Sequence, residues 1–334
     1  MTVTVELTRD GNRLEIICDG LRPREVRLSP PPPGASPVVR VDGGRTQVDV
    51  DPSVPRYVAT LKLDGGYCRV PERHVNLSGA ANFRDLGGYG LPAGRTVRWG
   101  ILFRSDHLDH TTGSDRAALA ALGIREVVDL RKPGERPPPG TAHPLGDVVV
   151  HHVPIGGLVA HLNGMTERML SGEIRDFSAA DMTRVYIDLL DGHPAYFAQA
   201  VRHVAGATGP VVVNCTAGKD RTGLVAAFVL SSLGAGREDV LRDYGLTQRY
   251  WSARKHAELQ SRFTAPDSDF SRVQAFFDAR PEALGGALDY LQTRHGGAWG
   301  YLCGAGRLPD TTLGLLRTRL TTATAVGTDR GDMA

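Results

Sequence analysis

Hydrophobic and polar positions alternate with a period of two along the first part of the chain. Residues 2–8 and 13–18 alternate in this way, and Asp10-Gly11 between them is typical of a tight hairpin turn. Further short apolar or alternating runs lie at 25–28, 38–41, 47–50 and 57–63. The turns between these runs are rich in Pro and Gly. The pattern predicts a small antiparallel β-sandwich domain over residues 1–70.

From about His74 the pattern changes to apolar strands that alternate with helices. We expect Ser114 to cap a helix that runs to Leu122, followed by strands at 126–130, 147–153 and 210–213 and an apolar helix at 222–233. Further helices are predicted at 238–250, 253–263, 271–279, 281–295 and 311–320. This order predicts an α/β domain over residues 74–322, with a central, mainly parallel sheet flanked by helices.

Two other segments have distinct expectations. Residues 155–190 show weak strand signals and helical spacing toward their end, and their position just before the strand at 210–213 suits a lid. The last residues, 323–334, have the composition of a disordered tail.

Composition narrows the class of protein. The chain has 334 residues, 41% of them hydrophobic, which suffices for one large core and a second small one. The net charge of +2 gives no footprint for nucleic acid, and no apolar run suits a membrane anchor or a secretory signal, so we expect a cytoplasmic protein. Its four cysteines are far apart and form no CxxC or Cys/His cluster, so neither a metal nor another cofactor is expected.

The richest chemistry lies in one short loop. Val211-Val-Val-Asn-Cys215 is followed by Thr-Ala-Gly-Lys-Asp-Arg221-Thr-Gly. A strand, five curling residues and a helix start aim backbone N–H groups at one anion, and Arg221 can hold two phosphoryl oxygens. Helix N-termini and nearby cations favour a cysteine thiolate. We therefore expect Cys215 to be the nucleophile, residues 216–221 to bind phosphate, and Thr222 to donate a hydroxyl hydrogen bond to the sulfur.

The phosphate-binding set expected from this loop has six members. They are Thr216, Ala217, Gly218, Lys219, Asp220 and Arg221.

Two other interpretations of the loop are weaker. A Walker-type phosphate loop requires Gly where Val213 stands and Ser or Thr where Asp220 stands. A lone buried cysteine is usually inert core. The combination of Cys215, Gly218, Arg221 and Thr222 at a strand–loop–helix junction favours catalysis.

The loop resembles the signature of the protein tyrosine phosphatase superfamily, Cys-x5-Arg followed by Ser or Thr. The chain is most similar to its bacterial atypical branch, which has tyrosine, dual-specificity and phosphoinositide activities. Further stretches carry the resemblance over roughly residues 74–320. They are Asn82-Phe-Arg-Asp-Leu-Gly-Gly88, Phe103-Arg-Ser-Asp106, Val128-Asp-Leu-Arg131, and the tail around His295-Gly-Gly and Tyr301-Leu302.

One position departs from the family pattern. The residue before the nucleophile is normally His and here is Asn214, which keeps a hydrogen bond but carries no charge. This departure leaves open a slower enzyme, or a phosphate-binding module with little turnover.

The general acid has two candidates. Family members commonly use an Asp on a mobile loop, but the stretch after the strand at 147–153 has none. Asp220 and Asp85 remain, with Asp220 slightly favoured. Asp220 can instead pair with Lys219, and Asp85 can instead orient Arg221. Asp106 and Asp129 are expected to hold turns or strand ends.

The sequence leaves the substrate open. Lys219 is either a second cation at the phosphate or a solvated lysine, and in related sequences a loop lysine accompanies polyanionic or non-protein substrates. His151-His152 are expected to be satisfied strand residues rather than metal ligands.

The overall expectation is a phosphate monoester hydrolase that works through a phosphocysteine. Its partner is a phosphorylated small molecule or a phosphoprotein. The lid, Lys219 and the added β-domain favour a small phosphorylated metabolite, such as a sugar or nucleoside phosphate. The alternative is a protein tyrosine, dual-specificity or phosphoinositide phosphatase.

Overall fold

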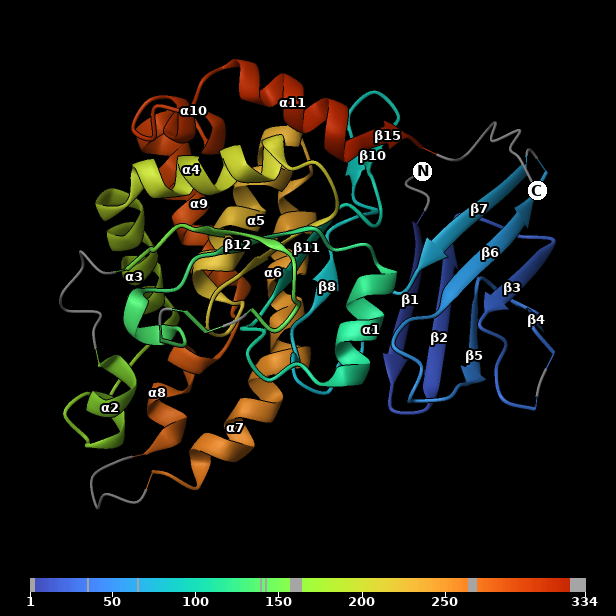
Figure 1. Ribbon diagram of the computed structural model, residues 1–334, viewed down its shortest axis with the longest axis horizontal. Helices are drawn as coiled ribbons and strands as arrows, with labels where there is room; N and C mark the ends of the chain where they lie inside the picture. Colours follow the sequence, from blue (N-terminus) through green and yellow to red (C-terminus); the bar gives the residue numbers. More distant parts are fainter. Residues whose placement is uncertain are drawn as a thin grey trace.

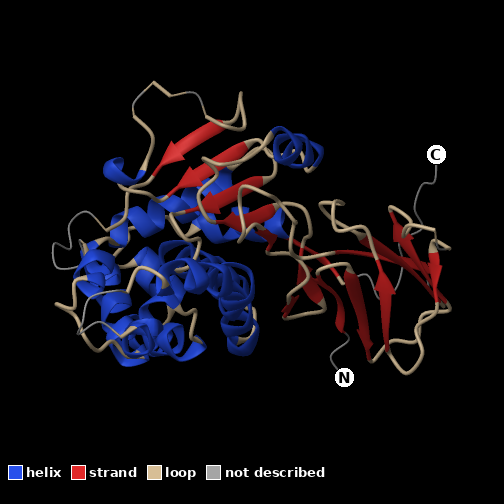
Figure 2. Cartoon of the chain, turned by 90° about the horizontal axis from the view of Figure 1, so that it is seen from below, coloured by secondary structure: helices blue, strands red, loops and turns tan. Residues whose placement is uncertain are grey.

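The computed structural model describes residues 4–324 except 35, 65, 139, 142, 157–163 and 264–268 (Figure 1). The first part of the chain is all β, and the rest packs helices around a sheet. Figure 2 shows this division, with strands alone at one end of the molecule and most helices gathered on one side of the main sheet.

The N-terminal part, called the β-part below, comprises the described residues from Thr4 to Pro71. It contains two antiparallel sheets, with strand orders β1-β2-β5 and β4-β3-β6-β7. Alternate side chains of both sheets are buried in one hydrophobic cluster that includes Leu14, Ile16, Leu28 and Leu61. The period-two pattern therefore did identify the inward faces, as expected for a sandwich. The strands are β1 (Thr4–Asp10), β2 (Arg13–Asp19), β3 (Glu25–Ser29), β4 (Val38–Val39), β5 (Arg45–Asp49), β6 (Val58–Leu63) and β7 (Gly66–Pro71).

The main sheet has the order β13-β12-β14-β11-β8. β11 (Leu102–Ser105), β12 (Glu126–Asp129), β13 (Val149–His152) and β14 (Val211–Asn214) run parallel, and β8 (Arg84–Asp85) is antiparallel to β11. The mainly parallel sheet is confirmed. β14 lies at its centre, so its carboxyl end opens at the middle of the sheet, where ligands bind in folds of this type.

Helices cover both faces of this sheet. Val211 and Val213 point into the larger helix-lined core, whereas Val212 points into a smaller core that Leu119 of α1 helps to fill. The helices are α1 (Gly113–Ala121), α2 (Met165–Leu170), α3 (Ala179–Gly192), α4 (Pro194–Gly206), α5 (Asp220–Leu233), α6 (Arg237–Thr247), α7 (Ala253–Gln260), α8 (Phe270–Phe277), α9 (Pro281–His295), α10 (Ala298–Cys303) and α11 (Thr311–Leu320).

Some expected boundaries are wrong. α1 is capped by Thr112 with Asp115 in a reciprocal capping box, two residues before Ser114. The predicted helices at 238–250 and 253–263 form one run, because the π-helical turn Gln248–Ser252 joins α6 to α7.

The chain also has a small third sheet, formed by β9 (Gly90–Leu91), β10 (Arg95–Val97) and β15 (Thr321–Ala323). Ala323 pairs with Arg95, so the predicted disorder does not start at residue 323. Residues 325–334 of the predicted tail and 157–163 of the predicted lid lie outside the described residues.

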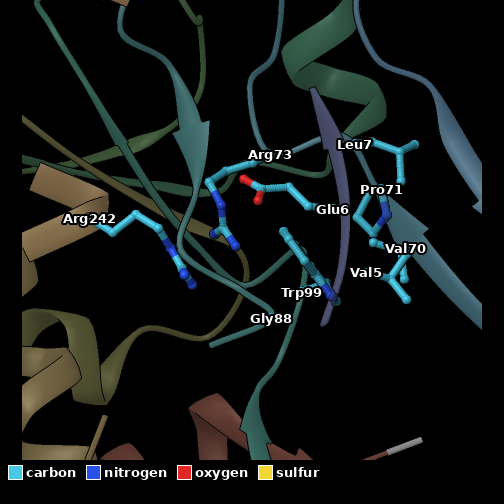
Figure 3. A pocket seen from close by; sticks show the side chains of 9 residues that line it. All are labelled: Val5, Glu6, Leu7, Val70, Pro71, Arg73, Gly88, Trp99 and Arg242. Carbon is cyan, nitrogen blue, oxygen red and sulfur yellow. The ribbon is translucent and has the colours of Figure 1, made fainter. Parts of the chain in front are cut away.

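The β-part meets the main domain through charged and aromatic side chains. Arg56 binds Asp85 at 2.7 Å, and Arg249 donates to the carbonyl of Arg9 at 2.8 Å. Figure 3 shows a small cavity at this junction, where the guanidinium carbon of Arg73 lies 4.8 Å from the centroid of the Trp99 ring. Its lining residues are Val5, Glu6, Leu7, Val70, Pro71, Arg73, Gly88, Trp99 and Arg242.

Candidate active site

Cys215 follows the central strand β14 and is 1% exposed. Five residues later, at Asp220, the chain enters α5, so the loop curls between a strand end and a helix N-terminus. Gly218 has a φ of +63°, and a Cβ there would lie 2.4 Å from the carbonyl of Ser105. Both the left-handed backbone and the close approach to β11 therefore require glycine.

The carbonyl groups at the start of the loop point away from the centre of the curl. The backbone N–H of His107 donates to Thr216 O at 3.2 Å, and Asn82 Nδ2 donates to Ala217 O at 2.9 Å. Because C=O and N–H point in opposite directions across a trans peptide, the N–H groups of the following residues face the inside of the loop.

The next two carbonyls are held in the same way by one guanidinium. Arg104 Nη2 lies 2.6 Å from Gly218 O and 3.4 Å from Lys219 O, and Gly223 N also donates to Lys219 O at 2.9 Å. In the part of the chain that the structure describes, the N–H groups of Gly218 and Lys219 have no backbone or side-chain acceptor. Residues 215–221, called the cup below, therefore surround a space with free N–H donors, which suits the binding of an anion.

A fully buried charge cluster lies beneath the cup. Arg84 and Arg104 share the carboxylate of Asp243, at 3.2 and 2.6 Å. Asn82 accepts from Arg84 at 2.5 Å while it donates to Ala217 O. Burial disfavours the charged form of Asp243, but the two arginines outweigh burial and lower its pKa to about 2. The motifs around residues 82–88 and 103–106 thus support the loop.

Arg221 is held by a carboxylate that sequence reasoning missed. Its Nη1 and Nη2 atoms lie 2.7 and 2.8 Å from the two oxygens of Glu135, and Thr216 Oγ1 donates to Glu135 at 2.8 Å. Burial disfavours the carboxylate, but hydrogen bonds and attraction from Arg221 outweigh it and lower the pKa of Glu135 to about 2. Burial also opposes the charge of Arg221, but its bonds to Glu135 and its attraction to Cys215 raise its pKa above the usual value.

Glu135 ends the short 3-10 turn Pro133–Glu135, and the backbone N–H of Lys132 donates to it at 2.8 Å. The sequence signals a turn there, with Pro133 at its first position and Glu135 three residues after Lys132. Nothing in that local signal connects the turn with Arg221, which lies 86 residues away.

Asp220 is the first residue of α5 and has a partly exposed side chain. Tyr186 of α3 donates its hydroxyl to Asp220 Oδ1 at 2.8 Å, and Lys219 Nζ lies 3.4 Å from the same oxygen. The pairing with Lys219 that the sequence left open is present. It leaves the Asp220 side chain 28% exposed at the start of α5.

Lys219 is neither solvated nor free. It is 2% exposed, and its ammonium donates to the carbonyl of Phe276 in the last turn of α8 and, at 3.2 Å, to that of Asp278 just after the helix. It also lies over the ring of Phe276 at 5.6 Å. The lysine side chain therefore connects the loop with the C-terminal end of α8, and its backbone remains in the cup.

Asp85 lies in the junction with the β-part rather than at the loop. One of its oxygens takes Arg56 at 2.7 Å and Gly100 N at 2.8 Å, the other takes Gly87 N at 2.8 Å, and the side chain is 0% exposed. The alternative role of Asp85, orienting Arg221, is not observed, because Arg221 binds Glu135. A buried carboxylate with all these donors has no path to a leaving group, so Asp220 is the remaining candidate acid.

Two buried polar groups that flank the loop in the sequence have no partner within the described structure. Among the described residues, neither Thr222 Oγ1 nor Asn214 Oδ1 has a hydrogen-bond partner. The predicted hydroxyl bond from Thr222 to the Cys215 sulfur is thus not formed in this structure. Both residues are at most 1% exposed, and Asn214 directly precedes the nucleophile in the chain.

The remaining polar residues of the motifs have structural contacts, as expected. Asp106 accepts from Ala81 N and Asn82 N at 3.0 Å each, and Asp129 binds Arg131 at 2.9 Å. His151 binds Glu126 at 2.9 Å. Within the described ranges, no group of three or more His, Cys, Asp and Glu is placed to hold a metal ion, and no helix there is long and apolar enough to cross a membrane.

Comparison with known proteins gives related sequences. The triple specificity protein phosphatase PtpB of Mycobacterium tuberculosis is 31% identical over 260 residues, which cover 69% of this chain and 93% of that protein. A tyrosine-protein phosphatase of Nostoc commune is 28% identical over 210 residues, covering 60% and 67%. A candidate tyrosine-protein phosphatase of Cupriavidus necator is 33% identical over 170 residues, covering 49% of this chain and 59% of that protein's length.

Solved structures show weaker likenesses. The Siw14 catalytic core of S. cerevisiae has a TM-score of 0.32 at 14% identity and covers 60% of this chain and 94% of that chain. TpbA of P. aeruginosa, solved in complex with pTyr, has a TM-score of 0.24 at 19% identity and covers 61% and 94%. Scores this low carry no argument about the site.

A family model also matches most of the chain. The model of the tyrosine phosphatase family matches residues 75–322, which include the cup, Asp220, Glu135 and the cluster beneath them, and it begins after the β-part. This chain therefore belongs to the tyrosine phosphatase family, a family of phosphoric monoester hydrolases.

Proposed function

We propose that the protein hydrolyses phosphate monoesters through a phosphocysteine at Cys215. The observation that carries the proposal is the cup, in which loop carbonyls are bound from outside and N–H groups face inward above the cysteine. Donors fixed in this way stabilise the charge of a transferring phosphoryl group without reorganising during the reaction. Arg221 adds a cation whose orientation Glu135 fixes.

The reaction has two displacement steps. Cys215 attacks phosphorus as its S–P bond forms, the ester P–O bond breaks with its electron pair on the leaving oxygen, and Asp220 gives that oxygen a proton. The Asp220 carboxylate then takes a proton from water while the water oxygen bonds to phosphorus. The S–P bond breaks, and the electron pair returns to sulfur.

For the substrate, we propose the phosphotyrosine side chain in a protein. Relatives bear the names tyrosine-protein phosphatase and triple specificity protein phosphatase. Two features that favoured a small metabolite have other roles in the structure. The Lys219 ammonium binds the carbonyls of Phe276 and Asp278. The described β-part binds the main domain through Asp85 and Arg249, and no hydrogen bond or ion pair joins it to residues 215–221.

A small phosphorylated metabolite is the second candidate, and one observation favours it. The segment predicted as a lid touches the cup at two points, where Arg221 donates to Ile155 O at 3.3 Å and Tyr186 binds Asp220. A segment closed against the cup can exclude water around a small ester.

The mechanism is tested with Cys215→Ser, and Cys303→Ser on α10 is the matched control. Cys215→Ser should abolish phosphate release, by about four orders of magnitude or more, while still binding inorganic phosphate. Cys303→Ser should behave as the wild type. Full activity of Cys215→Ser would reject the covalent route, and activity that a chelator abolishes would reject a metal-free reaction.

The substrate is tested by a phosphate-release screen of the wild type. Phosphotyrosine peptides should have kcat/KM values orders of magnitude above those of phosphoinositides and of sugar and nucleoside phosphates. A small ester with the highest value would reverse the assignment. Phosphate binding without release from any compound would support a binding module.

A further inference from the structure

The two oxygens of Asp220 have different surroundings. Oδ1 takes the Tyr186 hydroxyl at 2.8 Å and lies 3.4 Å from the Lys219 ammonium. Oδ2 has no recorded partner among the residues that the structure describes. One oxygen is thus held by the protein and the other is left open at the rim of the cup.

Tyr186 is itself held by a second tyrosine. Its hydroxyl oxygen lies 2.5 Å from that of Tyr244 on α6, and both side chains are almost fully buried. The rings meet edge to face with centroids 6.3 Å apart. Gly223 makes room for this arrangement, because a Cβ there would lie 3.0 Å from the Tyr244 ring. Tyr186 of α3 and Tyr244 of α6 thus pack together against the first turn of α5, where Asp220 lies.

The direction of the hydrogen bonds follows from the number of protons. Each tyrosine has one O–H, and a carboxylate can only accept. If Tyr186 gives its proton to Asp220, its oxygen must accept from Tyr244, so the donors run from Tyr244 to Tyr186 to Asp220. Burial, with the negative charge of Asp220, raises the pKa of Tyr186 well above its usual value, so its hydroxyl stays a donor at working pH.

We propose that Tyr186 is a positioning residue for the general acid, which holds Asp220 by Oδ1 so that Oδ2 carries the transferred proton. The inference rests on the proposed function, in which Asp220 is the acid. In the first displacement the Oδ2–H bond breaks as the proton moves to the leaving oxygen. The carboxylate left behind is stabilised at Oδ1 by the Tyr186 hydroxyl and the Lys219 ammonium. In the second displacement Oδ2 takes the proton of the attacking water.

This role differs from simple packing in its dependence on the leaving group. A poor leaving group needs its proton in the transition state, whereas a good one departs with little help. Loss of the Tyr186 hydroxyl should therefore slow poor leaving groups selectively. A purely structural role would change all substrates equally, or only stability.

The test uses Tyr186→Phe, which keeps the ring and removes one hydroxyl. On a series of aryl phosphates of rising leaving-group pKa, we expect kcat/KM, which reports the first displacement, to fall about tenfold for the poorest leaving group and less than about twofold for the best. Tyr244→Phe should change kcat/KM in the same pattern but less. Tyr186→Phe combined with Asp220→Asn should be no slower than Asp220→Asn alone.

The matched control is Tyr301→Phe. Tyr301 is also buried, and its hydroxyl donates at 2.6 Å to Leu190 O in the same helix α3, without touching Asp220. It should lose stability without changing the leaving-group dependence. Urea unfolding of each variant shows whether the fold is retained.

The outcomes separate the two levels of inference. If the loss of activity in Asp220→Asn is the same for good and poor leaving groups, the acid assignment of the proposed function fails. If that loss is larger for poor leaving groups, but Tyr186→Phe and Tyr244→Phe slow all substrates equally or not at all, the positioning role alone is overturned. Additive losses in the double variant would also overturn it.

Discussion

The cup at residues 215–221 and the cluster beneath it are both rich in charged groups. They differ in whether those groups and the nearby donors are paired within the protein. In the cluster, Arg84, Arg104 and Asp243 are at most 1% exposed, and both arginines bind the aspartate. In the cup, Arg221 and Glu135 are partly exposed, and the inward N–H groups are left without acceptors in the described structure. The first arrangement fixes the backbone, and the second leaves donors for a ligand.

The two candidate acids illustrate the same difference. Asp85 and Asp220 both belong to sequence motifs of the family. Asp85 is 0% exposed with donors on both oxygens, whereas the side chain of Asp220 is 28% exposed with one oxygen open. Membership of a motif therefore does not distinguish a supporting carboxylate from a reacting one. What distinguishes them is whether the carboxylate has an oxygen without a hydrogen-bond donor.

The largest effect should come from the cup, with Arg221→Lys. Lysine keeps the positive charge but loses the fork that binds Glu135 and two phosphoryl oxygens, so kcat/KM should fall about a thousandfold. Steady-state kinetics measure this. Arg237→Lys, at an exposed pair with Asp289, should leave kcat/KM unchanged. A loss below tenfold for Arg221→Lys would mean that a positive charge alone suffices at this position. The orientation of the guanidinium by Glu135 would then have no role in catalysis.

In the cluster, Asp243→Asn should act on stability. It leaves two buried arginines without a counter-charge, so the free energy of unfolding should fall by about 3 kcal/mol. Urea unfolding at neutral pH measures it. Asp239→Asn, which breaks an exposed pair with Arg242 on the same helix, should cost no more than about 0.5 kcal/mol. Equal losses in the two variants would show that burial of the cluster has no special weight.

The sequence predicted the parts of this site that local order determines. A strand, Cys215, a glycine with left-handed backbone and a helix start are consecutive, so their geometry follows from neighbouring residues. The two-residue periodicity of the β-part and the parallel strands were predictable for the same reason. The division of the chain at residue 70 and the lid remain predictions.

The supporting contacts were not predictable, because they join residues distant in the sequence. Asn82 reaches Ala217 across 135 positions, and Arg56 reaches Asp85 across 29. The contact of Glu135 with Arg221 is also long-range, and Lys219 turns toward a helix end that periodicity cannot place beside it. Single-sequence patterns show which residues carry charge but not which charges meet.

A smaller effect should come from the link between the two regions, with Asn82→Ala. This change removes the donor to Ala217 O, which supports the cup, so kcat/KM should fall about tenfold. The factor should be the same for good and poor leaving groups. Asn76→Ala, which removes an exposed bond to Pro52 O, is the control and should have no effect. Activity unaffected by Asn82→Ala would show that the cup keeps its shape without the cluster.

The smallest effect should appear in the pH dependence of stability, with Glu135→Gln. The pKa of Glu135 is lowered from its usual 4.5 to about 2 in the folded protein. Its ionised form thus adds stability that is complete above the unfolded pKa and is lost as the pH falls through the window from 4.5 to about 2. Glutamine keeps an oxygen for Arg221 but cannot titrate.

In urea unfolding at a series of pH values, the wild type should therefore lose about 1 kcal/mol more than Glu135→Gln across this window, the effect being reduced by the partial exposure of the pair. Asp243 titrates in both proteins, so its contribution cancels in the difference. Parallel curves would mean that Glu135 is not held by Arg221 in solution, and the cup would then present an arginine that no carboxylate orients.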